Sequence, residues 1–113
     1  TNSITGTAYA NDPTIMSWQL ANEPRPAGDA AHADLPEFYG WVRETAQFIK
    51  SLDPNHMVST GSEGVKGALE QPEIVLAEHG FPSIDYLTVH IWPNNWGWVK
   101  QDDLSSTAAA GES

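Results

Sequence analysis

The sequence WQLANEP, residues 18–24, decides the expected fold, because it begins as a buried strand and ends on a carboxylate and a proline. With the residues before it, it forms the apolar run TIMSWQLAN (residues 14–22), which is typical of a strand buried on both faces of a parallel sheet. Pro24 lacks a backbone donor, so strand pairing should stop there, and its ring biases Glu23 toward extended backbone angles. We therefore expect the end of a rigid strand to hold Glu23.

Side-chain alternation along this strand predicts the direction in which Glu23 points. Successive side chains of a strand face opposite sides, so Glu23 should face away from Leu20 and Trp18. If the helices cover Leu20 and Trp18, the carboxyl group of Glu23 points into the open mouth of the sheet.

The clearest helix is predicted over residues 35–51. Asp34 and Glu37 form an acidic capping box, and Pro36 lies in the first turn, where its missing N–H costs little. The apolar positions of this helix are expected to form one stripe that faces the core, and they are Phe38, Trp41, Val42, Phe48, Ile49 and Leu52.

Two more strands and a weaker helix are predicted farther along the chain. The strands are MVSTG (residues 57–61) and DYLTVHIW (residues 85–92), and the helix covers about residues 73–79. Alternating strands and helices predict an α/β fold with a parallel sheet. Three parallel strands leave two open edges and uncovered apolar surface, so we expect weak stability or self-association.

Composition limits the classes of function that fit. The chain has 113 residues, enough for one small domain, and a formal net charge of -10, which argues against a nucleic-acid or anionic-membrane partner. It contains no cysteine, which excludes a disulfide and a thiolate metal site. No apolar run approaches the ~18 residues of a membrane span. Thr1 is not an initiator methionine and no signal peptide is visible, so we expect a processed chain or part of a longer protein.

Polar and aromatic side chains are predicted to meet where the strands end. Asn22 and Glu23 end the first strand, Gly61-Ser62-Glu63 ends the second, and His90 and Trp92 end the third. Parallel α/β folds bind their ligands at the carboxyl ends of the strands. The sequence therefore predicts one site that combines two carboxylates, an amide, an imidazole and an indole.

Each of these residues also has a simpler interpretation. Asn-Glu-Pro is a common strand-to-loop turn, His90 alone is more often structural, and Glu63 alone is most often a solvated loop acid. Trp92, Trp96 and Trp98 could belong to a core or to a partner interface. Their joint occurrence at three successive strand ends favours a functional site.

The segments WQLANEPRP, SLDPNHMVSTGSEG and DYLTVHIWPNNWGW together resemble glycoside hydrolase family 5, in the clan of (β/α)₈ retaining glycosidases. The endo-β-1,4-mannanase branch is the most similar, because Arg25 follows Asn-Glu-Pro and because His-Ile-Trp-Pro and Trp-Gly-Trp are present. The resemblance covers about residues 1–100. It implies a partial (β/α)₈ barrel, about strands four to six with their helices, and makes residues 1–113 a fragment of a catalytic domain.

The resemblance also implies a role for each matching residue. Glu23 is expected to be the general acid/base, and Asn22 to bind the sugar 2-hydroxyl near the scissile bond. The remaining substrate-binding residues are expected to be Arg25, Glu63, His90, Trp92, Trp96 and Trp98. Many relatives have tyrosine at the position of Trp92, so we expect stacking or shape from Trp92 in place of a phenolic hydroxyl.

The implied reaction is the retaining hydrolysis of β-mannan or a related polysaccharide by two carboxyl groups about 5–5.5 Å apart. Burial and the nearby anionic nucleophile should raise the pKa of Glu23 toward about 6, so that it can donate a proton. The clan's nucleophile is a Glu that ends the seventh strand, beyond these residues, and neither Glu63 nor Glu112 fits its place. The isolated chain is therefore expected to be inactive, and the reaction needs no metal or cofactor.

Three other interpretations remain. The chain could be a non-catalytic carbohydrate-binding module that uses its tryptophan cluster, an interaction fragment, or part of another β-1,4-glycanase of the clan. Mannan is too large to enter a cell, so the substrate class implies a secreted, extracellular protein.

Overall fold

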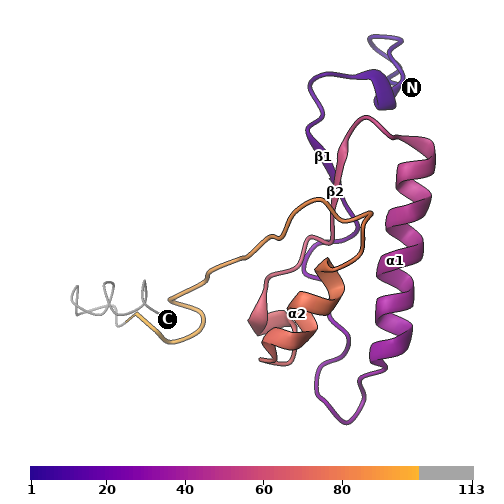
Figure 1. The fold of residues 1–113 in the computed structure, drawn as a ribbon. Coiled ribbons are helices and arrows are strands. Elements are labelled where there is room, and N and C mark those ends of the chain that lie inside the picture. Colours follow the sequence, from indigo (N-terminus) through magenta and orange to yellow (C-terminus); the bar gives the residue numbers. More distant parts are fainter. Residues whose placement is uncertain (100–113) are drawn as a thin grey trace.

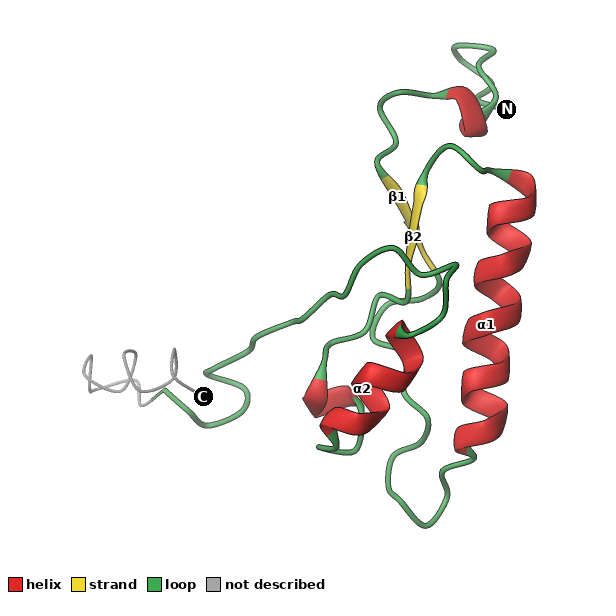
Figure 2. Ribbon diagram, viewed as in Figure 1, coloured by secondary structure: helices red, strands yellow, loops and turns green. Residues whose placement is uncertain are grey.

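The computed structural model describes residues 1–99. Its centre is a parallel pair of short strands, β1 (Ser17–Gln19) and β2 (Met57–Ser59), in the register Ser17↔Met57. Figures 1 and 2 show the long helix α1 (Leu35–Leu52) along one side of this pair and the short helix α2 (Pro72–His79) below it. Two short 3₁₀ helices, η1 (Tyr9–Asn11) and η2 (Val65–Gly67), complete the regular structure of the described residues.

The first two of the three predicted strands exist, as β1 and β2, but they are shorter than expected. Backbone pairing continues past their ends, because Leu20 N–H donates to Ser59 O (3.1 Å) and Glu23 N–H donates to Gly61 O (3.0 Å). Gly61 has a φ of +78°, so the chain turns away from a strand there. The expected parallel arrangement of the first two strands is confirmed.

The prediction of a third strand over residues 85–92 is wrong. This segment lies beside β2 and its extension, but the backbone bonds that join them are far apart: Asp85 N–H to Val58 O (2.8 Å) and His90 N–H to Glu63 O (3.2 Å). Between them, the hydroxyls of Ser59 and Thr88 donate to backbone carbonyls across the gap. Side chains thus replace the regular ladder on which a strand depends.

The helix predicted over residues 35–51 is confirmed as α1, and the one near residues 73–79 as α2. Asp34 Oδ1 accepts from Glu37 N–H (3.0 Å) at the start of α1, and Asp53 N–H donates to Ile49 O at its end. The capping residue and the proline in the first turn thus define the beginning of α1, as the sequence indicates.

The core forms between α1 and β2. Its buried apolar residues are Phe38, Val42, Ala46, Val58 and Ile84. Leu20 packs against this cluster and the Trp18 indole donates to Asp53 after α1. Both side chains therefore lie toward the helix, which is the condition under which Glu23 was expected to face the open mouth of the sheet.

The predicted single stripe of α1 is partly wrong. Trp41, Phe48 and Leu52 are 38%, 63% and 65% exposed, whereas Ala46 is fully buried. At about 100° per residue, these three side chains lie roughly 90° around the helix from the buried face. The helix therefore has two adjacent apolar faces, and the described residues cover only one.

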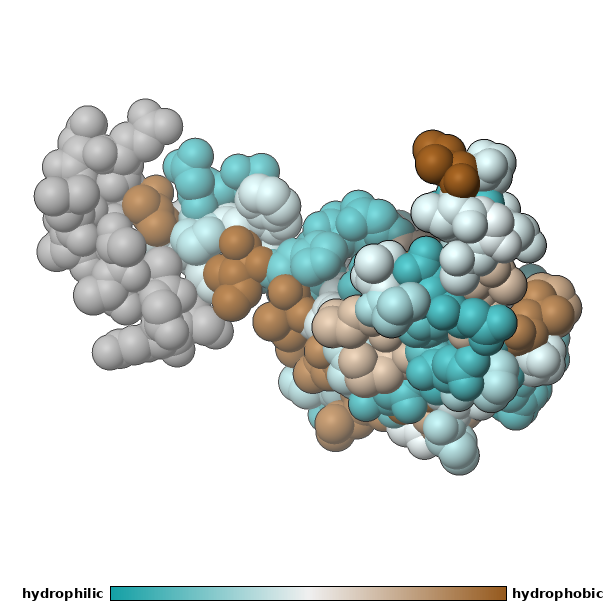
Figure 3. Space-filling view, turned by 90° about the horizontal axis from the view of Figure 1, so that it is seen from above, coloured by the Kyte–Doolittle hydropathy of each residue, from teal (hydrophilic) through white to brown (hydrophobic). Residues whose placement is uncertain are grey.

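Apolar side chains are also exposed on the arm that leads toward the C-terminal end. Leu87, Val89 and Ile91 are 51%, 57% and 60% exposed, and the side chains between them are half-buried. Figure 3 shows apolar groups along this arm. This alternation is typical of a chain with one face uncovered. None of the helices within residues 1–99 is both long and apolar enough to span a membrane.

Candidate active site

Glu23 and His90 meet at the end of the strand pair, although 67 residues separate them in the sequence. His90 Nδ1 lies 2.7 Å from Glu23 Oε1, and both side chains are 27% exposed. The predicted meeting of these two groups is confirmed. A carboxyl group and an imidazole in hydrogen-bond contact, open to solvent on one side, can exchange a proton with a ligand.

The backbone of Glu23 differs from the prediction. Its φ is +52°, in the left-handed region, and not extended as the following proline suggests. The N–H of Glu23 donates to Gly61 O, and this bond holds the residue in the bend where β1 ends. Non-glycine residues rarely adopt this conformation, and those that do are often found at functional sites. The bend, and not an extended strand end, sets the direction of the carboxyl group.

The expected rise in the pKa of Glu23 is not found in the described residues. The hydrogen bond from His90 lowers the pKa, burial opposes it only in part, and Trp92 and the charges of His90 and Arg25 lower it further. The expectation required deep burial and a neighbouring anion. Glu23 is partly exposed, and no carboxylate within residues 1–99 raises its pKa.

Arg25 and Glu63 form a second pair beside the first. The Arg25 guanidinium donates to Glu63 Oε1, with the Glu63 side chain 3% exposed and the Arg25 side chain 51% exposed. Glu63 is therefore not a solvated loop acid. Because His90 N–H also donates to Glu63 O, the three segments that carry Glu23, Glu63 and His90 are joined at one place.

Close packing around Glu63 depends on glycines. A Cβ at Gly61 would lie 1.9 Å from Ala21 O, and a Cβ at Gly67 would lie 2.8 Å from Glu63 Cγ. Gly64 has a φ of +87°, which favours glycine. Sequence reasoning missed Gly64 and Gly67, although the spacing of Gly61, Gly64 and Gly67 was a visible signal.

The three tryptophans divide into two groups. Trp92 is 53% exposed and helps to lower the pKa of Glu23. Trp96 and Trp98 instead pack edge to face, with ring centroids 4.8 Å apart. The ammonium of Lys66 lies 6.0 Å from both of these ring centroids. Lys66 was not singled out from the sequence, because nothing in its neighbourhood there points to the tryptophans.

Asn22 is a predicted site residue that the structure does not join to Glu23 and His90, and the side chains of Trp96 and Trp98 contact each other and Lys66 in place of that pair. The side chain of Asn22 is exposed, and it makes no hydrogen bond with the part of the chain that the structure describes.

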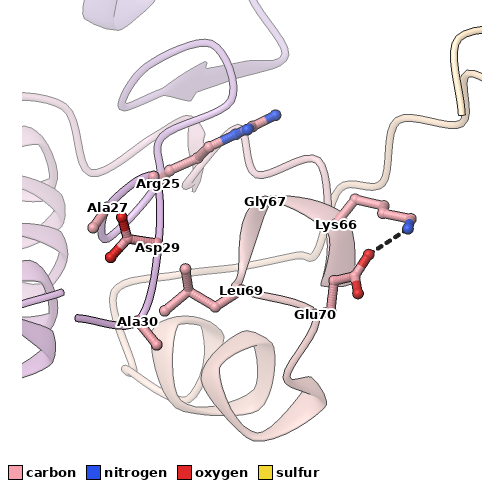
Figure 4. Close-up of a pocket in the computed structure, with 9 residues that line it drawn as sticks. Arg25, Ala27, Asp29, Ala30, Lys66, Gly67, Leu69 and Glu70 are labelled. Carbon is pink, nitrogen blue, oxygen red and sulfur yellow. Dashed lines mark hydrogen bonds and ion pairs between the residues drawn. The ribbon is translucent and has the colours of Figure 1, made fainter. Parts of the chain in front are cut away.

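A pocket of about 280 Å³ adjoins Arg25 (Figure 4). The segment of residues 25–30 forms one wall, and η2 with the residues after it forms the other. Figure 4 shows Leu69 between the two walls and the ion pair of Lys66 with Glu70 at one edge. Its charged residues are Arg25, Asp29, Lys66 and Glu70, so acidic and basic groups balance.

Comparison with known proteins gives the family. The model of the GH family 5 beta-mannosidase-like family matches residues 1–111. The chain belongs to this family. The resemblance of its motifs to glycoside hydrolase family 5 is therefore confirmed.

Three relatives show how much of the family 5 domain is present. Mannan endo-1,4-beta-mannosidase 4 of Oryza sativa subsp. japonica is 36% identical over 94% of the chain and 25% of its own length. A family 5 mannosidase of Rhizomucor miehei is 35% identical with a TM-score of 0.75, and the match covers 98% of this chain and 23% of that one. A mutant of that mannosidase was solved in complex with mannosyl-fructose. The endo-1,4-beta-D-mannanase of Thermotoga petrophila is 31% identical with a TM-score of 0.67, over 81% of this chain and 29% of that one. The chain spans about a quarter of the length of the curated relatives that it matches, and its structural neighbours are (β/α)₈ barrels.

Proposed function

We propose that the complete protein hydrolyses internal β-1,4-mannosidic bonds in mannan or a related polysaccharide, with Glu23 as general acid/base. The contact between Glu23 and His90 carries this proposal, because it places a proton-exchanging carboxyl group at the end of the strand pair. The names of the relatives, mannan endo-1,4-beta-mannosidases, support the reaction. The complex of the Rhizomucor miehei mutant with mannosyl-fructose supports a mannose-containing ligand.

The proposed mechanism retains the configuration at the anomeric carbon. One carboxyl group protonates the leaving oxygen while a second, about 5–5.5 Å away, attacks the anomeric carbon, and water then hydrolyses the glycosyl-enzyme. Glu23 donates the proton in the first step and removes one from water in the second. In the second step, a hydrogen bond from His90 stabilises the ionised carboxylate of Glu23.

The second carboxylate of this proposal comes from outside these 113 residues. Within the site, Glu63 is already engaged by Arg25 and is buried. A proton donor near neutral pH needs a raised pKa, and the hydrogen bond from His90 acts in the opposite direction. The negative charge of the nucleophile would favour the protonated form of Glu23 and supply the missing rise. We assign the strands of this segment to positions four to six of the barrel, with the nucleophile at the end of strand seven.

The remaining residues bind sugar in this proposal. The exposed guanidinium of Arg25, fixed by buried Glu63, offers donors to sugar hydroxyls, and the exposed amide of Asn22 binds the 2-hydroxyl. Trp92, Trp96 and Trp98 offer apolar faces for pyranose rings. Because the polysaccharide is too large to enter a cell, we place the protein outside it.

The experiment that tests this function uses the complete gene product and the 113-residue chain side by side. We expect the complete protein to cleave β-1,4-mannan internally and to release the β-anomer first, as followed by proton NMR. The isolated chain should release no product. Mannan cleavage by the isolated chain would contradict the assignment of the nucleophile, and initial release of the α-anomer would contradict a retaining mechanism.

A second candidate function is sugar binding without hydrolysis, which the 53% exposure of Trp92 favours. Binding of mannan that survives Glu23→Ala but is lost in Trp92→Ala, in a protein with no hydrolytic activity, would support it. Faster cleavage of another β-1,4-glycan than of mannan would instead indicate a different glycanase of the clan.

A further inference from the structure

The loop of residues 92–99 folds on itself at the end of the apolar arm. Its backbone is closed by local hydrogen bonds, such as the one from Trp98 N–H to Pro93 O (2.8 Å). Within residues 1–99, the last backbone hydrogen bond from this arm to another segment is the one from His90 N–H to Glu63 O (3.2 Å). Backbone bonds therefore define the shape of the loop, and side chains must set its direction relative to the rest of the site.

One side chain from outside the loop, that of Lys66, contacts both Trp96 and Trp98. Its ammonium lies 6.0 Å from each of the two ring centroids. A cation at this distance over an indole is attracted by the negative charge of the ring face. The two rings meet at an interplanar angle of 67°, and an edge-to-face contact covers only one face of one ring. One cation thus holds two indoles, the tryptophan pair, which keep flat apolar surface for a sugar ring.

The position of Lys66 is fixed by its own surroundings. It lies in η2, and its ammonium forms an ion pair with Glu70 at the edge of the pocket beside Arg25 (Figure 4). A Cβ at Gly64, directly before η2, would lie 3.1 Å from Val89 Cγ1, so η2 begins in close contact with the apolar arm. Lys66 is therefore held from below by the turn and from one side by Glu70.

The pocket beside Arg25 and the tryptophan pair are joined through Lys66. The pocket measures about 280 Å³, and both Arg25 and Lys66 line it. Its acidic and basic groups balance, which suits a neutral ligand such as a hexose better than an ion. Because Lys66 lines the pocket and also contacts the indoles, the surface that can bind sugar continues from Arg25 to the tryptophan pair.

We propose that Lys66 is a positioning residue: it holds the tryptophan pair at the edge of the pocket, so that the pair binds the hexose next to the one at Arg25. This inference rests on the proposed function, because Arg25 and the tryptophans are there assigned to sugar binding. Loss of the cation should therefore weaken the binding of a long sugar chain and leave proton transfer at Glu23 in place.

The test compares variants of the complete enzyme on two substrates. Mannohexaose is long enough to reach the tryptophan pair, whereas 2,4-dinitrophenyl β-mannoside has a single sugar and is not. Lys66→Met removes the cation and keeps an apolar side chain, so KM for mannohexaose should rise about fivefold, with kcat changed less than about twofold. KM for the dinitrophenyl mannoside should stay near that of the wild type.

Two further variants separate the cation from a general change of the surface. Lys66→Arg keeps a cation that stacks on aromatic rings, so it should retain the KM of the wild type for mannohexaose. The matched control is Arg43→Met, which removes an exposed cation on α1 that pairs with Glu44 and should change neither constant. An unchanged KM in Lys66→Met, a fivefold rise in Lys66→Arg, or an equal rise on both substrates would each overturn the proposal.

A double-mutant cycle distinguishes positioning from direct binding of sugar by Lys66. In a background that carries both Trp96→Ala and Trp98→Ala, Lys66→Met should raise KM for mannohexaose no further, since the rings that it positions are already absent. Additive effects would show that Lys66 acts on the sugar without the tryptophans, and would contradict the positioning role.

Failure of the proposed function would be seen separately, as a wild-type protein that cleaves no β-mannan. In that case crystal structures of the wild type and Lys66→Met decide. A loop of residues 92–99 that is displaced from η2 in the variant would support the positioning role, and an unmoved tryptophan pair would contradict it.

Discussion

Two carboxylate–imidazole pairs with the same oxygen–nitrogen distance lie at opposite ends of the strand pair. Asp53 Oδ2 and His56 Nδ1 lie 2.7 Å apart just before β2, and Glu23 Oε1 and His90 Nδ1 lie 2.7 Å apart beyond the ends of both strands. The first pair is almost fully buried, with side chains 7% and 9% exposed, and the second pair is 27% exposed on both sides. Identical chemistry thus occurs in two different environments.

In the buried pair, Asp53 and His56, each polar side-chain atom has a hydrogen-bond partner. Asp53 accepts from the Trp18 indole, the His56 ring and the backbone of Asn55 and His56, and His56 Nε2 lies 3.0 Å from Asp12 O. Burial acts to raise the pKa of Asp53, but the bonds from Trp18 and His56 prevail and lower it to about 2. The bond to Asp53 raises the pKa of His56. Both ring nitrogens of His56 face acceptors, so the pair is a fixed ion pair that stabilises the fold.

The partly exposed pair, Glu23 and His90, makes fewer hydrogen bonds. His90 Nε2 has no hydrogen-bond partner in the part of the chain that the structure describes, and Glu23 adopts a rare backbone conformation. A group that must gain and lose a proton during turnover cannot be fixed in one charge state by several partners. Position at the carboxyl ends of the strands and incomplete bonding, and not the residue types, distinguish the pair that we propose to be catalytic.

The largest expected effect comes from Glu23→Gln in the complete enzyme. The amide cannot donate a proton to the leaving oxygen, so kcat on mannohexaose should fall by about 10²–10⁴-fold. Its melting temperature should stay close to that of the wild type. A drop in melting temperature equal to that of a variant of the buried pair would remove the distinction between the two pairs.

Mutation of the buried pair should instead lower the stability of the protein and leave its rate unchanged. Asp53→Asn breaks an ion pair and leaves His56 without its counterion, so we expect the melting temperature to fall by about 10 °C with kcat unchanged. Calorimetry and initial rates on the same preparation check this. A loss of kcat in fully folded Asp53→Asn would show that the buried pair also serves catalysis.

The pH dependence of the melting temperature tests whether Asp53 and His56 form a stabilising ion pair. Asp53 has a lowered pKa, so its contribution is present above the ordinary value of 3.8 and is lost as pH falls toward about 2. His56 has a raised pKa, so its contribution is complete below 6.5 and is lost as pH rises through its higher folded value. The difference in melting temperature between wild type and Asp53→Asn should therefore be largest between about pH 4 and 6.5. A difference that is constant from pH 3 to 9 would contradict the ion pair.

His90→Gln should have a smaller effect on rate but a distinctive pH profile. Loss of the imidazole removes the main cause that lowers the pKa of Glu23, so that pKa should rise. Because the active form of Glu23 in the first step is protonated, the alkaline limb of kcat/KM should move to higher pH, with kcat/KM lowered about tenfold at the optimum. An alkaline limb that moves to lower pH would exclude this role of His90.

The smallest predicted effect is a change in stability that comes from the backbone conformation of Glu23. Glu23→Gly places a residue without Cβ at a φ of +52° and should raise the melting temperature by about 2 °C while abolishing hydrolysis. Glu63→Gly, at a position without a positive φ, is the control and should lower it. A lower melting temperature in Glu23→Gly would show that the contact with His90 stabilises the fold more than the bend destabilises it.

Local sequence signals predicted the parts of the fold that depend on neighbouring residues. The Asp34 cap and Pro36 define where α1 begins, and alternation correctly places Trp18 and Leu20 on the same side of the chain. The meeting of Glu23 and His90 was also predictable, because the segment that carries His90 runs beside β2 as expected, although it does not form the predicted strand.

The remaining features depend on contacts between distant segments. The burial of Ala46 in place of Phe48 depends on which face of α1 meets β2, and the burial of Glu63 depends on Arg25 and on close packing at Gly67. The positive φ of Glu23 follows from a hydrogen bond to Gly61, 38 residues away in the chain. No pattern within residues 18–24 contains that information.

The most direct test of the central claim compares two leaving groups on the Glu23→Gln variant of the complete enzyme. An unactivated sugar needs a proton to leave, whereas 2,4-dinitrophenolate does not, so an acid/base variant should keep its first step on the dinitrophenyl mannoside. We expect a rapid burst of dinitrophenolate followed by slow turnover, together with loss of mannohexaose cleavage. Equal loss of activity on both substrates, without a burst, would contradict the assignment of Glu23 as the general acid/base.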